Sequence, residues 1–182
     1  MPTFTLSHLA IILGLGFGLP QIFGILNPDR FRKSVRSFSR SLICGYILMT
    51  LGTSWFLWNL YIEAISDFES YKRMMYVGFA GIGILTCLYV SDFLAVRGSA
   101  ILFLLLAKAM VDASRWVESS WRWVVVLWAY ILIIAGVWFT VSPWRMRDFL
   151  HWATETENRI RIGSSVRLGF GLLLVILGFT VF

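Results

Sequence analysis

Long apolar stretches alternate with short polar connections along the whole chain. Six such stretches cover residues 4–26, 41–62, 74–94, 99–113, 123–141 and 164–182. An α-helix needs roughly 20 residues to cross a bilayer, and most of these stretches approach that length. The pattern predicts an all-α membrane protein, a single bundle of about six transmembrane helices. The fourth stretch is the weakest, because Lys108 and Asp112 interrupt it.

Composition supports a membrane location and excludes an ordinary soluble domain. Of the 182 residues, 58% are hydrophobic and 14% are charged, whereas soluble domains carry about 25% charged residues. The mean hydropathy of +0.77 agrees. Since spans of about 20 residues use up most of the chain, little is left for a domain outside the membrane.

The distribution of basic residues predicts the orientation of the bundle. Eleven lysines and arginines fall on one side of the predicted spans, and four fall on the other, namely Lys72, Arg73, Arg115 and Arg122. The positive-inside rule places the richer side in the cytoplasm and both termini outside. We therefore expect a multi-pass protein of a bacterial-type inner membrane or plasma membrane. The basic residues flank apolar stretches, so anionic inner-leaflet lipids are the expected partner and nucleic acid is not.

The two long cytoplasmic connections begin alike. Residues 27–32 are NPDRFR and residues 142–147 are SPWRMR. In both, a residue that can cap a helix precedes proline at the first helical position. The likeness suggests a parallel internal repeat, with units 4–62 and 123–182 flanking a central hairpin, 74–113, that turns at Arg97-Gly98. Convergence of basic interfacial loops on a similar composition is the alternative.

Both connections are also predicted to form amphipathic helices that lie in the inner membrane interface. Phe31, Val35 and Phe38 share one helical face, and residues 146–153 carry a second apolar stripe, followed by the pairs Glu155–Arg159 and Glu157–Arg161. Basic side chains of these connections are the candidate contacts to lipid head groups: Arg30, Arg32, Lys33, Arg36, Arg40, Arg145, Arg147, Arg159, Arg161 and Arg167.

Lys108 and Asp112 form a candidate charge pair inside a predicted span. They are four residues apart and so share one helical face, and counting from residue 99 places Lys108 near the middle of the bilayer. A proton or ion relay, or a site for a charged ligand, is one interpretation. A structural ion pair facing the bundle interior, or a lysine reaching toward the interface, is the other. The absence of further ionisable residues at that depth favours the structural pair.

Several glycines are predicted to let helices approach closely, within the bundle or against a partner. They do not form a phosphate-binding GxGxxG loop, because the spacing differs and no strand precedes them. These candidate packing positions are Gly14, Gly18, Gly78, Gly81, Gly169 and Gly171.

No motif for catalysis, a metal or a cofactor is found in the sequence. His8 and His151 fall on opposite sides of the predicted membrane, and Cys44 and Cys87 lie singly within apolar stretches. We therefore expect no enzyme activity and no cofactor. The favoured function is a structural or accessory membrane subunit that packs against other helices, from its own copies or another protein. The alternative is a small transporter or channel that uses Lys108 and Asp112. A membrane enzyme acting on lipids ranks third.

Overall fold

The computed structural model describes residues 5–63 and 66–182, and within them it is all-helical. Residue 4, the predicted start of the first span, lies outside this part. The described chain contains eight α-helices and one short 3₁₀ helix: α1 (Leu6–Leu26), α2 (Pro28–Phe38), α3 (Leu42–Ile62), η1 (Ser66–Tyr71), α4 (Lys72–Tyr89), α5 (Leu94–Ser114), α6 (Arg122–Val141), α7 (Pro143–Ala153) and α8 (Glu157–Thr180).

Five of these helices are long and apolar enough to cross a membrane, namely α1, α3, α5, α6 and α8. They confirm a multi-pass, all-α membrane protein. The other long helix, α4, has 18 residues and begins with Lys72 and Arg73, so its apolar part is shorter. A sixth span therefore stays a prediction.

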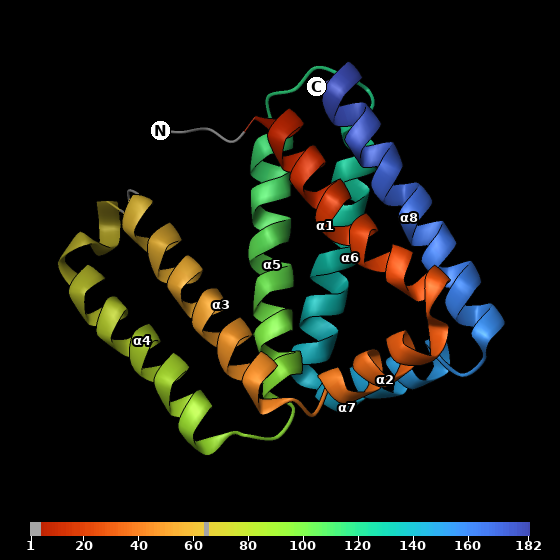
Figure 1. Ribbon diagram of the computed structural model, residues 1–182. Coiled ribbons are helices and arrows are strands. Elements are labelled where there is room, and N and C mark those ends of the chain that lie inside the picture. Colours follow the sequence, from red (N-terminus) through yellow and green to blue (C-terminus); the bar gives the residue numbers. More distant parts are fainter. Residues whose placement is uncertain (1–4, 64–65) are drawn as a thin grey trace.

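The helices form a bundle with a layer across one end (Figure 1). α8 lies along α1, α6 lies along α5, and α3 packs on the other side of α5. α4 packs mainly on α3, at the edge of the bundle. α2 and α7 lie side by side across one end, which we name the α2–α7 end. The first described residues and the carboxyl terminus lie at the opposite end, the termini end.

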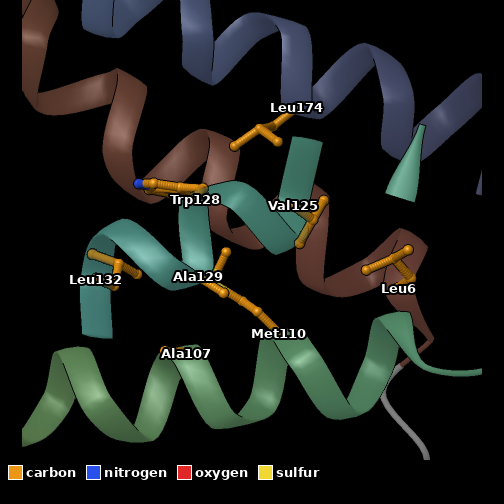
Figure 2. Packing of buried hydrophobic residues seen from close by; sticks show 8 residues of the cluster. All are labelled: Leu6, Ala107, Met110, Val125, Trp128, Ala129, Leu132 and Leu174. Atoms are coloured by element: carbon orange, nitrogen blue, oxygen red, sulfur yellow. The ribbon is translucent and has the colours of Figure 1, made fainter. Parts of the chain in front are cut away.

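The core is centred on α6, which joins α5 to the α1–α8 pair (Figure 2). Trp128 is 9% exposed, and its ring centroid lies 5.2 Å from Phe17 of α1 and 5.2 Å from Phe170 of α8. Such aromatic contacts add to the packing of the apolar surface. The buried cluster consists of Leu6, Ala107, Met110, Val125, Trp128, Ala129, Leu132 and Leu174.

The predicted turn at Arg97-Gly98 is wrong, because both residues lie in the first two turns of α5. The connection from α4 ends at Phe93, whose φ of 55° and ψ of 30° are left-handed. Gly98 allows close helix packing here: a Cβ at this position would lie 2.8 Å from the backbone nitrogen of Met49 in α3. The sequence pattern predicted a turn at Gly98, whereas this glycine lets two helices touch. The predicted start of this span, residue 99, is therefore five residues too late.

The helices α2 and α7 have the same length and nearly the same geometry at the N-cap. Each has 11 residues and begins with proline. Their caps, Asn27 and Ser142, have nearly equal dihedral angles, φ −133° and ψ 72° against φ −132° and ψ 75°. The next helix is capped in both cases by a hydroxyl, because Ser41 accepts from the Cys44 N–H and Thr156 accepts from the Arg159 N–H. The two connections therefore run in one register.

This cap corrects the predicted end of the second interfacial helix. Thr156 is extended (φ −122°, ψ 152°) and starts α8, so α7 ends at Ala153 and the Glu157–Arg161 pair lies in α8. Arg159, Arg161 and Arg167 therefore belong to the last helix and not to a connection.

Packing partners differ between the two predicted repeat units. α8 lies along α1 of the other unit, whereas α3 lies along α5. The duplication of 4–62 and 123–182 stays a prediction.

Candidate functional site

Lys108 and Asp112 belong to a larger charged cluster at the termini end. Lys108 Nζ lies 2.9 Å from Asp112 Oδ2 and 3.4 Å from Glu63 Oε1. Arg115 Nη2 lies 3.7 Å from Asp112 Oδ1. Glu63 is the C-cap of α3, so this cluster connects α3 to α5. We name Glu63, Lys108, Asp112 and Arg115 the charged tie.

The charged tie lies beside helix ends and not at mid-length. Since α5 begins at Leu94 and ends at Ser114, Lys108 lies within its last two turns, level with the end of α3. All four side chains are between 42% and 62% exposed. Exposed ion pairs of this kind each contribute little to stability. Because the four charges alternate in sign, the cluster can hold the ends of α3 and α5 together. The sequence did not pair Glu63 with Lys108, because the two are far apart along the chain.

Most of the basic side chains predicted to contact head groups gather at the α2–α7 end. Arg36 of α2 joins the layer together: its Nε donates to Thr154 Oγ1 and its Nη2 to the Thr154 carbonyl, both at 3.0 Å. Arg32 pairs loosely with Asp29 at 3.7 Å. The side chains with the most exposure are Arg30, Lys33, Arg40, Arg145, Arg159 and Arg161.

Arg167 lies apart from this layer. It is half-buried and stands ten residues into α8, about 15 Å along the helix at 1.5 Å per residue.

The candidate packing glycines fall into two groups. Gly14, Gly18 and Gly171 lie where α1 and α8 touch: a Cβ at Gly171 would lie 2.7 Å from the Gly14 oxygen and 2.9 Å from the Gly18 Cα. Gly78, Gly81 and Gly169 face open space, since a Cβ there would meet no described atom within 4 Å.

A pocket of about 540 Å³ opens at the α2–α7 end, between three segments that are distant in sequence. They are the α2–α3 connection, the α4–α5 connection and α7. The Arg147 guanidinium lies 5.9 Å from the Phe93 ring centroid and pairs with Asp148 at 2.8 Å. The lining is Ser39, Arg40, Leu42, Ser91, Asp92, Phe93 and Arg147. Only Arg40 and Arg147 were singled out by sequence, because nothing local links Ser91–Phe93 to the basic layer.

The part of the chain that the structure describes holds no group of three His, Cys, Asp or Glu side chains arranged for a metal ion. Cys44 and Cys87 are free and half-buried.

Comparison with known proteins does not assign this chain to a family. A scan against models of protein families found no match, and searches of curated proteins and of solved structures found no significant similarity.

Proposed function

We propose that this protein is a non-catalytic subunit of a membrane complex, which binds a transmembrane helix of a partner through the uncovered face of α4. The proposal includes six spans, with α4 as the third. It places the α2–α7 end in the cytoplasm and both termini outside, because eleven basic residues fall on one side of the predicted spans and four on the other. α2 and α7 then lie along the inner interface, with their exposed basic side chains toward anionic head groups.

The observation that carries the proposal is the pair of uncovered glycines on α4. Gly83 faces α3, where a Cβ would lie 2.7 Å from Thr53 Oγ1. Gly78 and Gly81 lie on the opposite side, beside Met74 and Leu85, which are 75% and 54% exposed. A glycine surface gives no advantage in contact with lipid chains. In contact with a second helix it does, because the missing side chains let the two helix backbones approach closely. Gly14 and Gly171 show such a contact within this bundle, whereas Gly16 and Gly169 are uncovered like Gly78 and Gly81.

Substituting these glycines tests the proposal. Gly78→Ile places a branched side chain on the docking face and should reduce the partner recovered with the purified protein about tenfold, as a loss of about 1.4 kcal/mol does. The matched control is Gly16→Ile, since Gly16 of α1 also meets no described atom within 4 Å. The protein is purified from native membranes in mild detergent, and its complex is weighed by native mass spectrometry. The mass distinguishes a second copy from a different partner.

Two outcomes would contradict the proposal. One is an unsubstituted protein that runs only as a monomer from native membranes. The other is equal loss of partner in Gly78→Ile and Gly16→Ile, which would show that any bulk on the lipid-facing surface has the same effect.

A small transporter or channel is the competing function, and the described interior supports it less. A transport route usually needs several polar groups at mid-membrane or broken helices. The described residues that are buried and polar include no charged side chain: Gln21, Ser39, Ser99, Ser114, Thr154 and Ser164. The charged tie lies at one end. A flux that depends on Lys108 would favour the transporter.

A further inference from the structure

The pocket at the α2–α7 end combines two guanidinium groups with one carboxylate. We propose that it binds the headgroup of a phospholipid that carries a primary amine, with the phosphate on Arg40 and Arg147 and the ammonium on Asp92. The inference rests on the interfacial placement of α2 and α7 proposed above.

The phosphate side of the pocket is built from guanidinium groups and helix N-termini. Arg40 is exposed and makes no ion pair within the described residues. Asp148 accepts from Nε and Nη2 of Arg147 at 3.0 and 2.8 Å, which leaves Nη1 for a phosphate oxygen. Planar guanidinium groups suit phosphate, because their N–H donors match its oxygens.

Two helices add to the positive potential there. α3 begins at Leu42 and α5 directly after Phe93, and both residues line the pocket. No side chain caps the start of α5. The N-terminus of a helix carries a partial positive charge that favours an anion.

The amine side of the pocket is Asp92. This carboxylate is exposed and, like Arg40, forms no ion pair within the described part of the chain. The lining therefore carries charges of both signs, as a zwitterionic headgroup does. A primary ammonium can donate hydrogen bonds to Asp92, whereas a quaternary choline cannot. A purely anionic headgroup would meet the carboxylate unfavourably.

Size and surroundings favour a lipid over a free phosphate ester. The volume of about 540 Å³ lies within the range of small-molecule sites and exceeds what a bare phosphate fills. Leu42 lines the pocket and is 45% exposed, and Ile43 next to it is 73% exposed. An acyl chain can therefore continue from the pocket along the apolar surface of α3.

Lipid titration of the detergent-purified, delipidated protein tests the inference. We expect one phosphatidylethanolamine to bind more tightly than phosphatidylglycerol or phosphatidylcholine, in native mass spectra and as a rise in melting temperature. Arg40→Gln should weaken this binding about tenfold or more, because a hydrogen bond to a charged group is lost. Asp92→Asn should remove the preference for phosphatidylethanolamine over phosphatidylglycerol.

Ser34→Glu is the matched control. It lowers the net charge by one, as Arg40→Gln does, but at an exposed residue of α2 that does not line the pocket. The bound lipid should therefore be retained. Equal weakening by Ser34→Glu and Arg40→Gln would overturn the inference in favour of general surface charge. Competition by glycerophosphoethanolamine as strong as by the lipid would instead identify a soluble phosphate ester.

These results are separable from those on assembly. The titration uses single copies in detergent and depends neither on the leaflet nor on a partner. Gly78→Ile can therefore fail to alter assembly while the pocket still binds lipid, and the pocket can fail while assembly still depends on α4.

Discussion

The α1–α8 pair and the α3–α4 pair are both made of antiparallel neighbours, but they are packed very differently. In α1–α8 the backbones touch: a Cβ at Gly14 would lie 2.5 Å from the Gly171 oxygen, and Ser7 donates to the Gly178 carbonyl at 2.6 Å. In α3–α4 the contact is made by side chains, such as the rings of Phe56 and Phe79 at 4.8 Å. α3 and α4, although consecutive in sequence, are thus held more loosely than the two helices at the ends of the described chain.

The difference indicates which surface of the molecule is complete. Helices in a bilayer gain little from hiding apolar surface from lipid, so close packing decides which of them associate. α1 and α8 have a third helix upon them, because Trp128 of α6 packs against both. α4 has no such helix within the described chain. Its outer face can accept a partner without disturbing the existing packing.

The largest expected effect comes from removing the side chain that joins α6 to α1 and α8. Trp128→Ala leaves a cavity between three helices and should lower the free energy of unfolding by about 3 kcal/mol. The matched change in the other pair, Phe79→Ala, should cost about 1 kcal/mol or less, because Phe79 is already 38% exposed and has one aromatic neighbour. Denaturant titration of helicity in detergent measures both. Equal losses would contradict the contrast between the two pairs.

Two glycines of α8 allow the same substitution, glycine to alanine, to be compared at a close helix contact and at an uncovered position. Gly171→Ala forces the backbones of α1 and α8 apart, since the Cβ would lie 2.7 Å from the Gly14 oxygen, and should cost about 2 kcal/mol. Gly169→Ala fills open space and should be neutral or stabilise by up to about 1 kcal/mol through helix propensity. Thermal unfolding of both variants in one detergent gives the comparison. A destabilised Gly169→Ala would show that α8 tolerates no added methyl group, whatever its face.

Elements set by local chemistry were predictable from the sequence, and contacts between elements were not. α2 and α7 begin where a cap residue followed by proline predicted them to begin, at Asn27-Pro28 and Ser142-Pro143. The expected hydrogen bond from the cap side chain forms in neither helix, so the proline is the signal that held. The start of α5 was missed, because Gly98 is as compatible with a turn as with a helix and only the approach of α3 distinguishes them.

The sites show the same limit. Lys108 and Asp112 could be paired by their spacing, but Glu63 joins them only because α3 and α5 end at the same level. The pocket combines two connections and α7, whose proximity depends on how the helices cross. No periodicity within one segment carries that information.

The smallest expected effect concerns the charged tie, which holds α3 to α5 at the end where no glycine contact does so. Lys108→Ala leaves Glu63 and Asp112 without their shared cation, while Arg115 still neutralises Asp112. Because these groups are partly exposed, the loss should be about 0.5–1 kcal/mol, and it should shrink in about 1 M salt, where the Debye length is about 3 Å. Lys108→Arg keeps the charge and serves as the control.

Proteoliposomes then separate the tie from a transport site. If the cluster is structural, proton or ion uptake by vesicles containing Lys108→Ala should equal that of the unsubstituted protein once the amount of folded protein is matched. Uptake that is abolished by Lys108→Ala, kept by Lys108→Arg and accompanied by unchanged stability would assign Lys108 to a permeation route. Such a result would also move the functional centre of the molecule from the uncovered face of α4 to the junction of α3 and α5.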